Sequence, residues 1–272
     1  MPTKKQNRSE RSLKNLKKQR GKYQDILLKI IEISDIIIEV IDSRFIDETR
    51  NKKIEKIITN KNKRIIYALN KSDLTNKKEI NGLYPYVFIS CKNRRGSKEL
   101  RNRIKIESQK IKNPNNYKRI HVGVIGYPNS GKSSVINLLK GKSSAKTGSE
   151  AGFTKGIQKI KLDENTLLLD SPGVIPLEKY SQENKEKISQ HAKLGARDYS
   201  KVKDPEIVVH TILKEYSKQI EKFYDIKANG DSEILIECLG KKLNYLKKRG
   251  IVDADRTSRH ILKDWQEGKI RV

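Results

Sequence analysis

The sequence predicts a doubly wound α/β fold with a mostly parallel sheet, followed by a small all-helical domain. Three observations predict it. Short β-branched runs recur between residues 36 and 169, helical stretches separate them, and no convincing strand pattern follows Pro176. Each run is apolar and bounded by polar residues, which is typical of strands buried on both faces of a parallel sheet.

The expected elements follow one another in the order that a parallel sheet requires. An amphipathic helix is expected from Gln24, strands at 36–42, 64–69, 87–90, 121–125 and 166–169, helices at 51–58 and 96–106, and an additional edge strand at 157–162. Residues 112–119 are polar and contain a proline, so they are expected to form a linker inside this domain.

Helix signals dominate the remainder of the chain. Asp204 before Pro205 is expected to open one helix, and Ser232 to cap a second that stops at Gly250. Asp253 or Asp255 is expected to open a third that ends at Gly268. We therefore divide the chain into a basic arm at 1–23, an α/β domain at 24–176 and a helical domain at 177–272.

The charge of the chain is strongly positive. Sixty Lys and Arg residues stand against 33 Asp and Glu, a formal net charge of +27. Residues 1–22 carry nine cations, one acid and almost no apolar side chains, so we expect a flexible arm or a helix that forms on a polyanion. A lysine-rich surface that only solvates the protein is the alternative. RNA is the favoured partner over a membrane, because no lipid-anchoring signal accompanies the charge.

Cysteine usage and hydropathy exclude several classes of protein. Cys91 and Cys238 form no Cys-x-x-Cys pair and no Cys/His cluster, so neither a disulfide framework nor a zinc site is expected. No apolar run approaches the roughly 20 residues of a membrane span. The sequence predicts a cytoplasmic protein that does not bind a membrane.

The strongest motif is Gly126-Tyr-Pro-Asn-Ser-Gly-Lys132-Ser133, which follows an expected strand and precedes an apolar helical stretch. The backbone N–H groups of such a turn, with a helix N-terminus behind them, bind phosphates. Lys132 is expected to reach the β and γ phosphates, and the Ser133 hydroxyl to bind Mg²⁺. The phosphate site is expected to include Asn129, Ser130, Gly131 and Ser134 as well. An ordinary glycine-rich turn is the weaker alternative, since this spacing arises by chance in roughly 1% of such chains.

A second phosphate-related motif, Asp170-Ser-Pro-Gly173, ends the expected strand at 166–169. Asp170 is placed to hold Mg²⁺ through a water, and the Gly173 N–H to sense a γ phosphate. Alone this pattern is common. Its value comes from its position some forty residues after the phosphate loop.

Asn70-Lys-Ser-Asp73 ends the expected strand at 64–69. The Asp73 carboxylate can accept hydrogen bonds from the ring N–H and the exocyclic amine of guanine, a pairing that adenine cannot supply. Lys71 is expected to lie along the plane of the base. The alternative is an Asx turn with a salt bridge.

Ser90-Cys-Lys92 ends the next expected strand. The Cys91 N–H could face the guanine oxygen and Lys92 could flank the ring, although an ordinary transition from strand to loop would look the same. All four motifs stand at the carboxyl ends of expected strands, where α/β sheets bind ligands. Together they predict a site for GTP or GDP.

The guanine motif precedes the phosphate loop, the reverse of the order in an ordinary small GTPase. In this the chain closely resembles the circularly permuted GTPases of ribosome assembly, the YlqF/RbgA and nucleostemin-like group. The resemblance extends over roughly residues 24–272. It includes a strand end at Ile38-Glu-Val-Ile-Asp-Ser-Arg44, a switch threonine in Gly152-Phe-Thr-Lys155, and C-terminal segments at Gly195-Ala-Arg, Asp204-Pro-Glu, Asp255-Arg and Trp265-Gln-Glu-Gly-Lys269.

The resemblance implies a circularly permuted P-loop GTPase that hydrolyses GTP to GDP and phosphate and acts in maturation of the large ribosomal subunit through rRNA contacts. It implies that Thr154 closes over Mg²⁺, so that Ser133, Thr154 and Asp170 form the metal set and Lys132, Thr154 and Gly173 the catalytic set. It also implies that Asn129 helps to seat K⁺. The linker at 112–119 then joins the two original chain ends. We expect a monomer.

Two departures from the family predict slow hydrolysis without an activating partner. Val174 stands where many GTPases place the glutamine that orients water, and no histidine lies near residue 1. The competing hypothesis is an RNA-docking GTP sensor with little turnover. A GTPase acting on tRNA is disfavoured, because no tRNA-binding domain is apparent. Since Gly173 is followed almost directly by the helical domain, nucleotide state and domain orientation are expected to be coupled.

Overall fold

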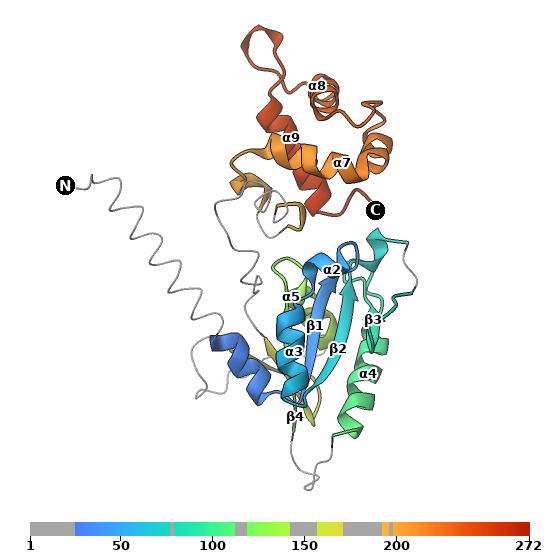
Figure 1. The fold of residues 1–272 in the computed structure, drawn as a ribbon, viewed down its shortest axis with the longest axis vertical. Helices are drawn as coiled ribbons and strands as arrows, with labels where there is room; N and C mark the ends of the chain where they lie inside the picture. Colours follow the sequence, from blue (N-terminus) through green and yellow to red (C-terminus); the bar gives the residue numbers. More distant parts are fainter. Residues whose placement is uncertain (1–24, 77–78, 112–118, 142–156, 171–191, 196–197) are drawn as a thin grey trace, which may run out of the picture. The chain divides into compact units, whose positions relative to one another are not determined.

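The computed structural model describes residues 25–76, 79–111, 119–141, 157–170, 192–195 and 198–272. These residues form two compact units. The first holds the described residues of 25–41, 50–70 and 81–170, and the second holds those of 42–49, 71–80 and 192–272. Figure 1 shows the sheet and its helices in the first unit and a group of helices in the second.

One sheet organises the first unit. Its strands are β1 (Ile36–Asp42), β2 (Arg64–Asn70), β3 (Tyr86–Phe88), β4 (Ile120–Gly126), β5 (Gln158–Lys161) and β6 (Thr166–Asp170), in the spatial order β3-β2-β1-β4-β6-β5. The pairs β2–β3, β1–β4 and β4–β6 are parallel, and β5 is antiparallel to β6. The prediction of a mostly parallel sheet is confirmed, and every expected strand is present with bounds that differ by a few residues.

Helices cover both faces of this sheet. Alternate side chains of β1 point to opposite faces, and all seven of its residues are buried. Ile36, Ile38 and Val40 pack in a core with α4 (Ser97–Gln109) and α5 (Lys132–Lys140). Ile37 packs in another core with the helical residues 25–33 and α3 (Lys52–Asn60). The fold is therefore doubly wound, as predicted.

The second unit is helical. Its main helices are α7 (Pro205–Tyr224), α8 (Ser232–Lys242) and α9 (Ala254–Gln266), with short turns at α2 (Ile46–Thr49), η1 (Ser72–Leu74), η3 (Tyr199–Lys201) and η4 (Lys248–Gly250). Backbone angles that are not helical at Tyr216 bend α7. Within the described parts of the chain, no helix is both long and apolar enough to span a membrane.

The expected bounds of the second helix of this unit were wrong. Asp231, rather than Ser232, caps α8 by accepting from the N–H groups of Glu233 and Ile234. The helix ends at Lys242, well before Gly250, because Asn244 takes a left-handed conformation with φ 54° and Tyr245 N bonds back to Gly240 O at 2.8 Å. A backbone bridge between Leu246 and Val252 then closes the loop.

The starts of the other two helices were predicted correctly, though one cap was not. Asp204 precedes α7 but its side chain makes no capping hydrogen bond. Asp253 caps α9 by accepting from Arg256 N, and the helix ends at Gln266, two residues before Gly268.

Two loops that leave the carboxyl ends of strands belong to the helical unit. In the loop after β1, the Phe45 ring lies 5.9 Å from that of Trp265 and 6.2 Å from that of Tyr216, between centroids. In the loop after β2, Leu74 O accepts from Val272 N at 3.0 Å. The expected domains at 24–176 and 177–272 did not include these two loops in the helical part, because such distant contacts leave no local pattern.

Candidate nucleotide-binding site

The phosphate loop joins β4 to α5. Asn129 and Gly131 take left-handed conformations, with φ of 59° and 97°, and Ser130 N bonds to Tyr127 O at 3.2 Å. This winding brings the chain to the N-terminus of α5, where the first N–H groups of a helix have no partners within the helix. The predicted context, a strand followed by a tight turn and a helix, is present, and it is the geometry that binds phosphates.

Lys132 opens α5 and is buried, with 8% of its surface exposed. Its Nζ donates to Tyr127 O at 3.3 Å. Burial lowers the pKa of this ammonium to about 8, and the negative charge of Asp170 opposes the shift. A phosphate group beside Lys132 would favour the charged form further. Ser133 and Ser134, in the first turn of α5, are exposed.

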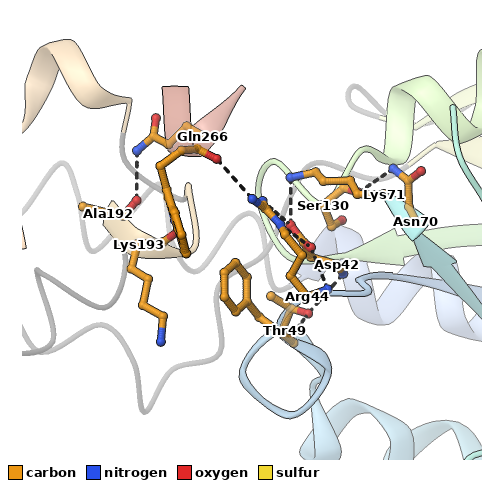
Figure 2. Close-up of polar contacts among 11 residues, drawn as sticks. Asp42, Arg44, Thr49, Asn70, Lys71, Ser130, Ala192, Lys193 and Gln266 are labelled. Carbon is orange, nitrogen blue, oxygen red and sulfur yellow. Dashed lines mark hydrogen bonds and ion pairs between the residues drawn. The ribbon is translucent and has the colours of Figure 1, made fainter. Parts of the chain in front are cut away.

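Asn70 connects three of the predicted motifs within the first unit. Its Nδ2 donates to Ser130 O of the phosphate loop at 2.8 Å, and its Oδ1 accepts from Cys91 N at 3.4 Å. Figure 2 shows Asn70 beside Ser130. The asparagine of the guanine motif is therefore held against the phosphate loop, although 60 residues separate them in sequence.

The Ser90-Cys-Lys92 segment forms a closed turn. Ser90 and Arg95 exchange backbone hydrogen bonds of 3.2 and 3.0 Å, and Ser90 Oγ accepts from Asn93 N at 3.1 Å. Lys92 is exposed on this turn. The Cys91 N–H donates to Asn70 here, and its expected contact with a guanine oxygen stays a prediction.

Asp170 is the last residue of β6, and its register partner on β4 is Val124, two residues before the phosphate loop. Its carboxylate and the Ser133 hydroxyl are hard oxygen donors of the kind that Mg²⁺ prefers, and Mg²⁺ in such sites takes its other ligands from phosphates and water. The residues present therefore fit the expected metal. Among the described residues, no group of three His, Cys, Asp or Glu side chains forms a separate metal site.

The remaining half of the guanine motif lies in the second unit. Lys71 takes a left-handed conformation with φ 60° and starts a turn that Leu74 N closes onto Lys71 O at 2.9 Å. Asp73 lies in the short helix η1 within that turn. Lys71 Nζ is 2.8 Å from Asp42 Oδ2.

Asp42 and Arg44 form a buried ion pair that the sequence analysis did not assign a role. Their side chains are 1% and 2% exposed, and Arg44 Nη2 lies 2.9 Å from Asp42 Oδ2 (Figure 2). Burial alone would raise the pKa of Asp42, but the charges of Arg44 and Lys71 lower it to about 2. The sequence signal that could have pointed to this ion pair is an acid at the end of a buried strand, followed two residues later by arginine.

Several predicted residues lie outside the described residues. Thr154, with the rest of the 152–155 motif, Gly173 and Val174 are among them. Their roles stay predictions.

Three comparisons place this geometry among known proteins. A family profile described as "50S ribosome-binding GTPase" matches residues 121–241. A GTP-binding protein of Methanocaldococcus jannaschii is 40% identical over 90% of this chain and 65% of its own length. Nucleolar GTP-binding protein 2 of Saccharomyces cerevisiae is 34% identical over 90% of this chain and 51% of its own length. The chain thus spans between half and two thirds of these relatives.

The fold matches a solved structure over nearly its whole length. GNP-bound YlqF from T. maritima superposes with a TM-score of 0.63, covering 91% of this chain and 94% of that one at 20% identity. At that identity the likeness shows the fold. In its permuted motif order, its sheet and its related sequences, the chain is similar to the circularly permuted GTPases, YlqF among them.

Proposed function

We propose that the chain binds GTP and hydrolyses it to GDP and phosphate. The observation that carries this proposal is the hydrogen bond from Asn70 to Ser130, since it fixes the start of the guanine motif against the phosphate loop. Two turns with unrelated functions would not be expected to share a buried hydrogen bond across 60 residues of sequence. The names of the relatives, which include GTP-binding proteins, support the same reading.

The proposed chemistry follows from the position of each group. Lys132 stabilises the negative charge that develops on the transferred phosphoryl group, and the N–H groups at the start of α5 bind the phosphate oxygens. Ser133, Asp170 and Thr154 would hold Mg²⁺, which would neutralise phosphate charge. Asn129 would help to seat K⁺, and the Gly173 N–H would sense the γ phosphate. With Val174 where many GTPases have glutamine, hydrolysis is slow until a partner orients the attacking water.

The proposed partner is the large ribosomal subunit or its precursor, contacted through rRNA. The net charge of +27 supports a polyanionic partner. The family profile bears the words "50S ribosome-binding", and a relative is called nucleolar. We propose that the protein acts as a monomer in the cytoplasm and does not bind a membrane.

Asp73→Asn tests the assignment of the guanine site. An amide in place of the carboxylate donates where the acid accepts, so GTP affinity should fall by orders of magnitude and xanthosine triphosphate should become the preferred nucleotide. Competition titrations with both nucleotides measure the switch, and Asp163→Asn, in the turn between β5 and β6, is a control. Unchanged GTP affinity in the Asp73 variant would exclude this guanine site.

Turnover distinguishes an enzyme from an RNA-docking GTP sensor. Phosphate release is measured with and without large ribosomal subunits, in K⁺ and in Na⁺. An enzyme should be stimulated by the subunit and should lose turnover in Lys132→Ala while its fold is retained. A rate that stays at background under every condition would favour the sensor.

A further inference from the structure

The carboxylate of Asp42 binds two cations at once. Its Oδ2 lies 2.8 Å from Lys71 Nζ and 2.9 Å from Arg44 Nη2, and its Oδ1 accepts from Arg44 N and Nε at 3.1 Å each. Figure 2 shows these contacts. Because Asp42 is buried and Lys71 is only partly exposed, at 22%, water screens this pair little. The side chain of the guanine-motif lysine is thereby held in one place.

Arg44 extends this contact to the C-terminal helix. Its guanidinium uses Nε and Nη2 on Asp42 and donates through Nη1 to the backbone oxygen of Trp265, near the end of α9, at 3.1 Å. The next residue, Phe45, is 1% exposed against Trp265 and Tyr216. The segment after β1 is therefore anchored by the Phe45 ring and by the Arg44 Nη1 hydrogen bond, and both contacts reach Trp265 of α9.

The guanine-motif turn has a second attachment to the same end of the chain. Leu74, which closes the turn, accepts at its backbone oxygen from Val272 N at 3.0 Å and packs its side chain against Gly268. The turn that carries Lys71 and Asp73 is thus attached to the segment after α9 as well as to Asp42.

We propose that Asp42 is a positioning residue for Lys71, and that Arg44 makes this positioning depend on α9, so that the helical unit sets the affinity for guanine nucleotides. The inference rests on the proposed GTP binding. It assigns the helical unit an effect on recognition of the base, separate from the γ-phosphate motif at Gly173.

The proposed role of Asp42 predicts how the affinities for GTP and GDP change together. GTP and GDP carry the same base, so loosening Lys71 should weaken both by the same factor and leave the ratio of their dissociation constants unchanged. Linkage is reciprocal, so a partner that moves α9 would change the affinity for both nucleotides, and each nucleotide would change the affinity for that partner.

A double-mutant cycle tests the proposal in the full chain. Dissociation constants for fluorescent GDP and GTP are measured for Asp42→Asn, Lys71→Met and the double variant, with unfolding followed by circular dichroism. We expect Asp42→Asn to weaken both nucleotides by about 10- to 100-fold, the ordinary range of coupling between sites. In the Lys71→Met background the same change should have almost no further effect, because its target is gone.

Arg44→Lys tests the link to α9, because lysine keeps the positive charge but lacks the planar group that binds Asp42 and donates to Trp265 O at once. We expect an equal loss for GDP and GTP, smaller than that in Asp42→Asn. Arg259→Lys is the matched control: Arg259 is a residue of α9, binds Asp255 of the same helix with its fork at 2.7 and 3.0 Å, and donates to a backbone oxygen, that of Tyr199. This variant should bind both nucleotides like the unaltered chain.

Three results would overturn the inference. They are unchanged affinity in Asp42→Asn, full additivity of Asp42→Asn with Lys71→Met, or a loss in Arg259→Lys equal to that in Arg44→Lys. If Asp42→Asn does not fold, Arg44→Lys and its control decide alone. A failure of the unaltered chain to bind any guanine nucleotide would overturn the proposed function itself and this inference with it.

Discussion

Asn70 Nδ2 lies 2.8 Å from Ser130 O, in a hydrogen bond that is buried. This bond joins the guanine motif to the phosphate loop, which follows 60 residues later in the sequence. The two motifs therefore lie together in the site although their order is permuted. The neighbouring Gly131 leaves room for it: a Cβ added to Gly131 would lie 2.1 Å from the same nitrogen.

Gly131→Ala should therefore displace Asn70 and weaken guanine-nucleotide binding. The lost buried hydrogen bond is worth about 1 to 1.5 kcal/mol, so a loss of about five- to tenfold in affinity is expected. Nucleotide titration measures it. In an Asn70→Ala background, Gly131→Ala should cost clearly less, because the atom that it meets is absent.

Gly141→Ala is the control for this prediction. Gly141 follows α5, has φ +67°, and would place its Cβ no closer than 4.0 Å to another side chain. It reproduces the backbone strain of a left-handed glycine without the contact. If both alanine variants weaken nucleotide binding equally, strain at the ends of this segment explains the effect and the contact with Asn70 does not.

Lys132 should make nucleotide binding depend on pH. Burial lowers its pKa to about 8 in the free chain, and bound phosphate favours the ammonium. Below pH 8 the side chain is already charged and affinity should be flat. Above pH 8 binding must take up a proton, so affinity should fall by up to about tenfold per pH unit until the pKa of the bound state is reached.

Calorimetry of GDP binding at pH 6.5 and pH 8.5, in buffers with different ionisation enthalpies, measures this proton uptake. Uptake is expected at pH 8.5 and should be near zero at pH 6.5. Lys140→Met, at the other end of α5, should behave like the unaltered chain. Equal uptake at both pH values would contradict the assignment to Lys132.

The strands and the phosphate loop could be predicted from the sequence because each depends on neighbouring residues. A run such as Ile36–Asp42 is buried on both faces, so apolarity alone marks it. The glycines and Lys132 form the phosphate loop within one turn. Such local patterns also place the starts of α7 and α9.

The contacts that unite distant residues could not be predicted in this way. Arg44 donates to a residue 221 positions away. Lys71 contacts Asp42 because β1 and β2, whose ends carry these residues, are neighbours in the sheet. The end of α8 depends on the fold in the same sense: Tyr245 bonds back to Gly240, and a bridge at Leu246 and Val252 closes the loop. A sequence pattern records that Asp42 and Arg44 are present, but their partners come from tertiary structure.

Glu39, in the middle of β1, should make the stability of the fold depend on pH. Its Oε1 accepts from Asn51 N at 2.8 Å, and burial, followed by the nearby charge of Glu55, raises its pKa to about 8. The folded state therefore favours the protonated acid, whose ordinary pKa is 4.5. The stability that Glu39 contributes is present below pH 4.5 and is lost as pH rises toward 8.

Glu39→Gln should remove this dependence, since the amide keeps an oxygen for Asn51 and has no charge. At pH 9 the variant should be more stable by roughly 1 to 3 kcal/mol, and at pH 5 the difference should nearly vanish. Thermal unfolding at both pH values measures this difference in stability. Glu99→Gln, at an exposed position of α4, is the control. Lower stability of the Gln variant at pH 9 would show that Glu39 is charged and needed in the fold.

The last prediction concerns the proposed contact with rRNA and separates two basic regions. In the cluster at 241–249, the structure pairs three of the cations internally: Lys241 with Glu237, Lys242 with Tyr224 O, and Lys247 with Asp253. Releasing such a cation to a phosphate would break its present contact. The nine cations of residues 1–22, which lie outside the described residues, are therefore expected to carry the larger share of the salt dependence.

Each phosphate contact changes the logarithm of the binding constant by about 0.7 to 0.9 per log unit of salt. Deletion of residues 1–22 should flatten the salt dependence of binding to large ribosomal subunits by several such contacts and weaken binding, while GTP affinity stays the same because the nucleotide motifs lie elsewhere. Replacing the nine cations with glutamine should reproduce the deletion, which isolates charge from length. Neutralising Lys241, Lys242 and Lys247 instead should flatten the slope less. Should the deleted and full chains bind subunits with one affinity and one slope, the arm only solubilises the protein.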